Sequence, residues 1–301
     1  MIETFSAELP SGVTLSCRAS GRRGAPVLMF LHGFPEAAFV WDAMLEHFGE
    51  RYRCIAPNLR GFEKSSAPAE PEAYRVKHLT SDLDALIAQV VTPAGGPLEA
   101  LIAHDWGGAV AWTFAVQRPQ MLKRLVIINS PHPATFLREL RDNPAQQAAS
   151  GYMNFLCRPD AAALLAENDF ERLWALFSNG GGAAWLSDSL RAQYRALWQQ
   201  GLDGPLNYYR ASPMRPPLSA ADPIHTLVLP PEFVTVRVPT TVLWGEADTA
   251  FALAVLDGLD AYVERLDVQR VAGASHWIVH EQPALVAGAI ARLLRPRRSV
   301  P

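Results

Sequence analysis

A charged residue at the end of an apolar run, followed closely by two glycines, is the feature that most constrains this chain. Residues 101–108 read Leu-Ile-Ala-His-Asp-Trp-Gly-Gly. In a strand-to-helix elbow the nucleophile stands on a strained turn, and small residues two positions before and after it let backbones cross closely. Ala103 and Gly107 hold those positions around Asp105. The pattern predicts a nucleophilic Asp105; the alternative is an Asp that only caps the following helix.

Apolar runs and helical spacings alternate through the first part of the chain. Residues 26–31 are apolar at every position, which is typical of a strand buried on both faces of a mostly parallel sheet. Such a sheet needs helices on both faces, so an α/β fold is predicted. The expected elements are a hairpin of strands at 3–9 and 13–18, further strands at 26–31, 54–57, 99–104 and 124–129, and helices at 41–48, 79–90 and 107–118.

The strand signal then stops, and helical spacing rich in Ala, Leu and Trp replaces it for about a hundred residues. Strands resume at 238–244 and 268–271, and Pro283 opens a last helix. The helical insert is expected over the carboxyl ends of the strands, where open α/β sheets bind ligands. The predicted domains are an α/β core at 1–133 and 235–301 and a helical lid at 134–234.

Charge and cysteine content exclude several classes of protein. A net charge of -3 and a pI near 6.2 give no electrostatic reason to expect nucleic acid or an anionic membrane as a partner. The three cysteines are odd in number and far apart, so a disulfide framework is not expected. The first twelve residues lack a targeting pattern, and apolar runs reach only about six residues, short of a membrane span. We expect a cytoplasmic protein, either a monomer or a homodimer.

Three groups that could form a catalytic triad stand at the ends of predicted strands. Asp105, Asp248 and His276 follow one another in the order nucleophile, acid, histidine. A loop Asp is usually a turn former and a lone His is usually structural, so the joint placement carries the prediction. Glu246 is the competing acid, and Asp248 is preferred because it lies farther out on the loop.

A pair of backbone amides could complete the site. The amide of Phe34, after the buried strand, and that of Trp106, after Asp105, are expected to point into one crevice and stabilise a developing oxyanion. An ordinary strand-to-loop turn would explain the glycine and proline around Phe34 equally well. His32 is expected to be a structural hydrogen-bonding residue. His276 and His280 are four residues apart, but no third ligand accompanies them, so no metal is expected.

Six short segments resemble those of the α/β-hydrolase-fold epoxide hydrolases, and they span nearly the whole core. They are His32-Gly33-Phe34-Pro35-Glu36, Arg60-Gly61-Phe62, His104-Asp105-Trp106-Gly107-Gly108, Asn129-Ser130-Pro131-His132-Pro133, Trp244-Gly245-Glu246-Ala247-Asp248 and Ser275-His276-Trp277. The resemblance implies an α/β-hydrolase fold in which Asp105 is the nucleophile, Asp248 the charge-relay acid and His276 the base. It also implies that Phe34 and Trp106 supply the oxyanion amides. One departure, Glu63-Lys64 where the family has a small residue and a polar one, concerns the shape of that loop.

The lid has to separate epoxide opening from dehalogenation, because both resembling groups use an Asp that forms an ester with carbon. An epoxide oxygen needs acidic hydrogen-bond donors such as tyrosine, whereas a halide needs only weak donors such as indoles. Residues 151–159 and 204–210 resemble the lid segments from which epoxide hydrolases project two tyrosines, here Tyr152 and Tyr209. Tyr208 is turned about 100° away on a helix, and Tyr194 is expected to pack.

The resemblance therefore implies a cofactor-independent epoxide hydrolase that forms a vicinal diol from a small-molecule epoxide. Trp106 and Trp174 are expected at the substrate beside the two tyrosines. A haloalkane dehalogenase is the main alternative, in which the same two indoles would hold a halide. A non-catalytic small-molecule receptor of the same fold is the other alternative.

Overall fold

An eight-stranded sheet forms the centre of the computed structural model, which describes residues 1–91, 96–178 and 183–295. The strand order is β1-β2-β4-β3-β5-β6-β7-β8; β2 pairs antiparallel with both β1 and β4, and the remaining pairs are parallel. The predicted mostly parallel α/β sheet is therefore confirmed. The strands are β1 Glu3–Glu8, β2 Thr14–Ser20, β3 Val27–Leu31, β4 Arg53–Pro57, β5 Ala100–His104, β6 Leu125–Ile128, β7 Thr240–Gly245 and β8 Leu266–Val271.

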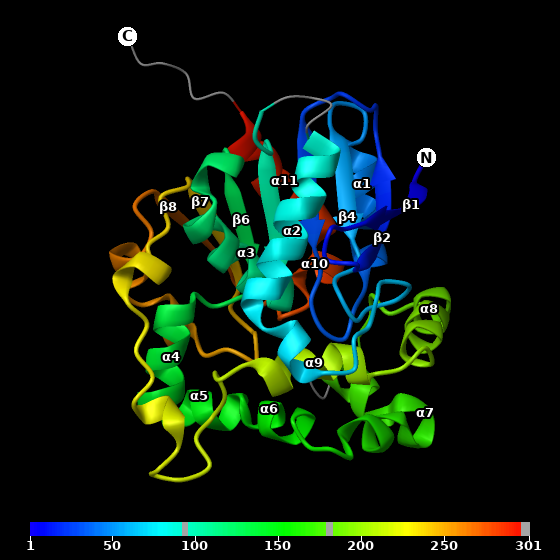
Figure 1. Ribbon diagram of the computed structural model, residues 1–301. Helices are drawn as coiled ribbons and strands as arrows, with labels where there is room; N and C mark the ends of the chain where they lie inside the picture. The colour runs from blue at the N-terminus through cyan, green and yellow to red at the C-terminus, as the bar shows by residue number, and fades with distance from the viewer. Residues whose placement is uncertain (92–95, 179–182, 296–301) are drawn as a thin grey trace.

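Helices cover both faces of this sheet. In Figure 1, α2 and α3 lie on the face toward the viewer, and α1 and α11 lie behind it. The core helices are α1 Asp42–Phe48, α2 Val76–Val91, α3 Asp105–Gln117, α10 Ile278–Glu281 and α11 Pro283–Leu294. Short 3-10 helices lie at Ala38–Trp41, Pro71–Tyr74, Pro119–Met121, Pro223–His225, Pro231–Phe233, Leu253–Leu256 and Leu259–Ala261.

The remaining helices lie between β6 and β7 in the chain and form a layer below the carboxyl ends of the parallel strands (Figure 1). In the described part of the interval between Ile128 and Thr240 there is no strand. The helices of this layer are α4 Pro133–Asp142, α5 Pro144–Ala149, α6 Gly151–Leu156, α7 Ala161–Ser178, α8 Asp188–Trp198 and α9 Asp203–Ala211. The lid boundaries at 134 and 234 stay a prediction, and lid denotes residues 134–234.

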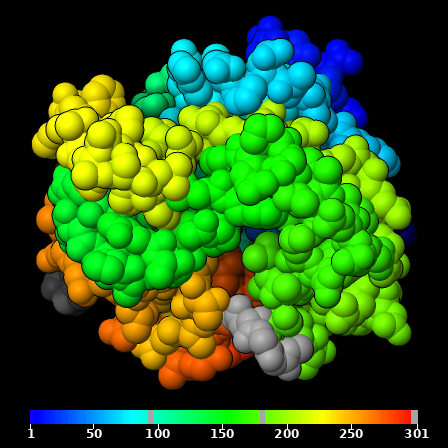
Figure 2. All heavy atoms as spheres, turned by 90° about the horizontal axis from the view of Figure 1, so that it is seen from below, coloured from blue at the N-terminus to red at the C-terminus, as the bar shows by residue number. Residues whose placement is uncertain are grey.

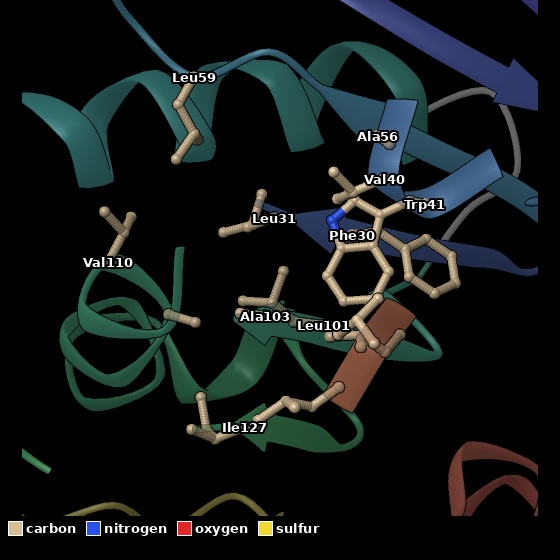
Figure 3. Packing of buried hydrophobic residues seen from close by; sticks show 14 of the residues in the cluster. Phe30, Leu31, Val40, Trp41, Ala56, Leu59, Leu101, Ala103, Val110 and Ile127 are labelled. Atoms are coloured by element: carbon tan, nitrogen blue, oxygen red, sulfur yellow. The ribbon is translucent and has the colours of Figure 1, made fainter. Parts of the chain in front are cut away.

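The core is built around the strands that are buried at every position. All five residues of β3 and of β5 are buried, as expected of strands covered on both faces. Figure 3 shows Leu31 and Ala103 from these neighbouring strands, and Phe30 packs on Trp41 with ring centroids 5.4 Å apart. This packing fixes the strand ends from which the site is built.

Two helices differ from what the local sequence pattern indicates. Helix α3 begins at Asp105 itself, two residues earlier than expected. Helix α7 is interrupted, because Asn168, Asp169 and Phe170 have left-handed backbone angles.

No helix in the described parts of the chain is both long and apolar enough to cross a membrane.

Candidate active site

Asp105 stands on a strained turn between β5 and α3. Its φ is 49°, in the left-handed region that side chains rarely adopt. Close crossing of backbones explains the neighbouring glycine: a Cβ on Gly107 would lie 2.6 Å from the carbonyl oxygens of Leu31 and His32. The Asp105 side chain is buried, with about 8% of its surface exposed. The turn thus presents one carboxylate at the carboxyl edge of the sheet.

The two other predicted triad residues lie beside this carboxylate. His276 Nδ1 lies 2.8 Å from Asp248 Oδ2, and His276 Nε2 lies 3.7 Å from Asp105 Oδ2. Asp248 follows β7 and His276 follows β8, so neighbouring parallel strands deliver them to one edge. Glu246, the competing acid, instead accepts a hydrogen bond from Arg270 at 2.7 Å. The structure therefore groups Asp105, Asp248 and His276.

Charges around the imidazole shift its protonation. Burial alone would lower the pKa of His276, but the charge and hydrogen bond of Asp248, with the charges of Asp105 and Glu36, raise it to about 9. Burial would raise the pKa of Asp248, but the nearby His276 charge and the hydrogen bonds that its carboxylate accepts hold it below its usual range. The acid is therefore ionised, and it fixes the orientation of the base.

The Phe34 amide donates to the nucleophile. Phe34 N lies 2.7 Å from Asp105 Oδ1. A Cβ on Gly33 would lie 2.2 Å from that same carboxylate oxygen, so only glycine permits this approach. Trp106 is the second residue of α3, and its ring meets Tyr209 edge-on at 5.0 Å. The role of the Trp106 amide stays a prediction. His32 is buried; its Nε2 accepts from Leu59 N at 3.0 Å, as expected of a structural histidine.

The two predicted tyrosines of the lid face each other above Asp105. Tyr152 lies on α6 and Tyr209 on α9, and their ring centroids are 6.2 Å apart. Burial, followed by the Asp105 and Asp248 charges, raises the pKa of Tyr152, and burial raises that of Tyr209 well above its ordinary value. Both phenols therefore stay protonated donors. Tyr208 points elsewhere, because its hydroxyl donates to Arg60 O at 2.8 Å.

Two cavities meet at these three side chains. Each is lined by Asp105, Tyr152 and Tyr209; one measures about 80 Å³ and the other about 230 Å³. The smaller is otherwise mostly apolar, and the larger also includes His276 and the segment at 249–250. Figure 2 views the lid side and shows a hollow bordered by green lid segments and orange core segments. A substrate could therefore extend to both sides of Asp105.

Trp174, also expected at the substrate, packs within the lid, and its contact with substrate stays a prediction. Trp174 does not belong to the lining of either cavity. Its indole N–H donates to Asp169 O at 2.8 Å, and its ring packs on Trp198 with centroids 4.4 Å apart. The left-handed turn in α7 brings the Asp169 carbonyl within reach. These contacts hold Trp174 within the lid, between α7 and α8.

Two side chains that organise the site were not predicted. Asn129 follows β6, and its Nδ2 donates to Asp248 Oδ2 at 2.7 Å. Glu36 follows β3, is fully buried, and accepts from Tyr194. A polar side chain within a few residues of the end of a buried strand is the signal that could have found both. The unusual Glu63 is held as well, because its Oε2 accepts from Ser16 Oγ at 2.7 Å.

Comparisons with known proteins agree with this geometry. The family model of the alpha/beta hydrolase fold matches residues 26–283. Epoxide hydrolase 4 of Mus musculus is 33% identical over 296 residues, covering 95% of this chain and 77% of that protein. The AB hydrolase superfamily protein YfhM of Bacillus subtilis is 32% identical over 289 residues, covering 95% of this chain and 96% of that protein.

Solved structures give the same result. A structure of novel epoxide hydrolases of the alpha/beta hydrolase superfamily, from metagenomes of hot environments, has a TM-score of 0.88 at 34% identity, covering 99% of this chain and 100% of that one. The epoxide hydrolase of Bacillus megaterium, in complex with an inhibitor, has a TM-score of 0.86 at 30% identity, covering 96% and 99%. The chain therefore belongs to the α/β-hydrolase-fold epoxide hydrolase family.

Proposed function

We propose that this protein hydrolyses a small-molecule epoxide to a vicinal diol through an ester on Asp105. The observation that carries the proposal is the meeting of one buried carboxylate and two protonated phenols in the same pair of cavities. The carboxylate can attack carbon from one side, while Tyr152 and Tyr209 donate hydrogen bonds to the oxygen that leaves. Placement of donors where negative charge develops is an efficient form of catalysis.

The first step forms one bond and breaks one. An Asp105 oxygen attacks an epoxide carbon, the ring C–O bond breaks, and its electron pair stays on the ring oxygen. That oxygen is hydrogen-bonded by Tyr152 and Tyr209, one of which supplies its proton. The product is a hydroxyalkyl ester on Asp105, and no atom leaves the site.

The second step returns the enzyme to its starting state. His276, oriented by Asp248 at 2.8 Å, takes a proton from water, and the resulting hydroxide attacks the ester carbonyl carbon. The Phe34 amide, which holds Asp105 Oδ1 at 2.7 Å, stabilises the negative oxygen of the intermediate. The bond between the acyl carbon and the alkyl oxygen then breaks, and the alkoxide takes the proton from His276. The proton of the new Asp105 carboxyl group returns to the tyrosine that gave its own in the first step, and the diol departs.

Donor chemistry favours the epoxide over the haloalkane alternative. A halide site built as the sequence allowed would need the indoles of Trp106 and Trp174 together. Trp174 lines neither cavity, and its N–H is already given to Asp169 O at 2.8 Å. Diol formation from an aryl epoxide and halide release from a chloroalkane, measured side by side, distinguish the two enzymes, and neither product would indicate the receptor.

A single turnover in heavy-oxygen water tests the covalent step. Because water attacks the acyl carbon, the first diol should carry no label and Asp105 should gain it. Asp105→Ala should abolish turnover. Label in the first diol, with none in Asp105, or an Asp105→Ala variant at the parental rate, would refute the ester mechanism.

We further propose that the protein works without a metal or organic cofactor, in the cytoplasm, as a monomer or homodimer. Each reaction step above uses only water and the side-chain and backbone groups of this chain. Activity that survives exhaustive chelation and dialysis would support the first point. Light scattering at micromolar concentration would decide the oligomeric state, because a species larger than a dimer would contradict the proposal.

A further inference from the structure

A buried carboxylate outside the triad joins the lid to the catalytic core. Glu36 is fully buried, two residues after Phe34. Its Oε1 accepts a hydrogen bond from Tyr194 at 2.6 Å and lies 2.6 Å from His280 Nε2. Its Oε2 lies 3.4 Å from His104 Nδ1. Four segments therefore meet at one side chain: the loop after β3, the lid helix α8, α10 and the end of β5.

Two of the three partners of Glu36 lie close to the triad in the chain. His104 precedes the nucleophile, and its Nε2 donates to the backbone oxygen of His276 at 2.9 Å. His280 lies four residues after His276. The hydroxyl of Tyr194 lies 3.2 Å from His280 Nε2, so the phenol contacts both Glu36 and His280 from the lid side.

Helix α8 holds two consecutive residues of the loop after β3. Besides the Tyr194 bond to Glu36, Trp198 Nε1 donates to Pro35 O at 2.8 Å. Both bonds are buried, so water does not compete for them. The next residue toward β3 is Phe34, whose amide holds Asp105 Oδ1 at 2.7 Å. Helix α8 of the lid thus contacts residues 34–36, called the oxyanion loop, through side chains that do not line the two cavities.

We propose that Tyr194 is a positioning residue: its hydroxyl, supplied by the lid, holds the Glu36 carboxylate and thereby the loop that presents the Phe34 amide to Asp105. The inference rests on the proposed epoxide hydrolysis. A buried carboxylate that loses one hydrogen-bond donor moves toward its remaining donors or binds a water molecule. Because amide donors act through fixed distances, a small displacement of the loop slows steps in which the Asp105 carbonyl becomes negative.

The variant that isolates the hydroxyl is Tyr194→Phe. The ring contacts remain, with centroids 5.0 Å from Phe39 and 4.8 Å from Phe177. Tyr208→Phe is the matched control, because it also removes a buried lid hydroxyl that donates to the core, but to Arg60 O. The expected result for Tyr194→Phe is ester breakdown slowed about tenfold in single turnover, with KM within about twofold of the parent. Tyr208→Phe should stay within about twofold in both.

Coupling to Glu36 is tested by a double variant. If the hydroxyl acts through the carboxylate, adding Tyr194→Phe to Glu36→Gln should slow ester breakdown by less than about twofold further. Trp198→Phe, which removes the other lid donor to the same loop, should reproduce the Tyr194→Phe pattern and serves where that variant does not fold. Multiplicative losses in the double variant would overturn the proposal, as would parental ester breakdown in Tyr194→Phe.

Hydrogen exchange separates this inference from the proposed activity. Without any substrate, Tyr194→Phe should speed amide exchange at residues 33–37 relative to the parent, and Tyr208→Phe should not. A parent that forms no diol would refute the epoxide hydrolase proposal while leaving this measurement to decide the role of Tyr194. Unchanged exchange in Tyr194→Phe would refute the positioning role, whatever the activity.

Discussion

Asn129 is the second side-chain partner of the triad acid. Its hydrogen bond helps to keep Asp248 ionised beside His276. Its Nδ2 donates to Asp248 Oδ2 at 2.7 Å, while its Oδ1 accepts from Gly245 N at 2.9 Å. Its backbone φ is 40°, a left-handed value that Asn and Asp tolerate better than other side chains. Asn129→Asp would therefore keep the turn and the acceptor, but replace the donor by a second carboxylate.

Two carboxylates in contact share a proton, so Asn129→Asp should partly neutralise the partner that orients His276. We expect ester breakdown to slow by about tenfold to a hundredfold, less than the loss of about 10⁴ from neutralising a triad acid outright. Asn168→Asp is the control, because Asn168 is exposed in the lid and also has a positive φ, of 51°. Single-turnover rates at the parental value in Asn129→Asp would contradict this role.

The raised pKa of His276 predicts a pH dependence of stability. Its folded value is about 9, above the value of about 6.5 in an unfolded chain, so folding takes up a proton between these limits. The stabilisation is fully present below about pH 6.5 and is lost as the pH rises through about 9. His276→Gln should remove this part of the decline, measured by urea unfolding at several pH values. His47→Gln, at an exposed position, should retain it.

The start of α3 is the element on which the active site is built, and it needs Gly107. A Cβ there would lie 2.6 Å from the backbone oxygens of Leu31, the last residue of β3, and of His32, which cannot move without disturbing the sheet. Gly107→Ala should lower the free energy of unfolding by about 1 to 3 kcal/mol or more. Gly288→Ala in α11, where the nearest atom lies 3.6 Å away, should raise it by about 0.5 to 1 kcal/mol. Urea unfolding of both variants measures the difference, and equal effects would contradict the crossing.

Elements set by local periodicity could be predicted from the sequence, and contacts between distant elements could not. The segment at 99–104, apolar from 100 to 103, predicts β5, and Ala103 and Gly107 predict the turn, because strand burial and backbone crossing leave local signals. Glu36 stands near the end of a buried strand, but its pairing with Tyr194 left no local signal, since that lid partner lies 158 residues away. The packing of Trp174 could not be predicted for the same reason: no local pattern predicts the turn at Asp169, whose carbonyl accepts from its indole.

At the scale of the whole molecule, strand order determines the order of the catalytic groups. The strands β3, β5, β6, β7 and β8 are neighbours in the sheet, and they are followed by Phe34, Asp105, Asn129, Asp248 and His276. Carboxyl ends of parallel strands meet at one edge, so this topology alone brings the five residues together. The lid must then place its tyrosines above that edge, which requires close docking on the core.

Two glycines let α9 approach the core closely. A Cβ on Gly204 would lie 2.6 Å from the carbonyl oxygen of Gly61 and 2.8 Å from its Cα. Gly204→Ala must therefore push α9 outward, and Tyr209 lies on the same helix. Because the phenol assists the departing oxygen, ester formation should slow about tenfold, whereas ester breakdown should change less.

Gly151→Ala is the matched control, because Gly151 begins α6, the helix of Tyr152, and a Cβ there would enter open space. It should form the ester within about twofold of the parental rate. Stopped-flow tryptophan fluorescence under single-turnover conditions follows both steps, and urea unfolding identifies any general loss of folded protein. Ester formation at the parental rate in Gly204→Ala would show that the position of Tyr209 does not depend on this contact. A selective loss would show that the lid acts on the first chemical step through α9, separately from its action on the oxyanion loop through α8.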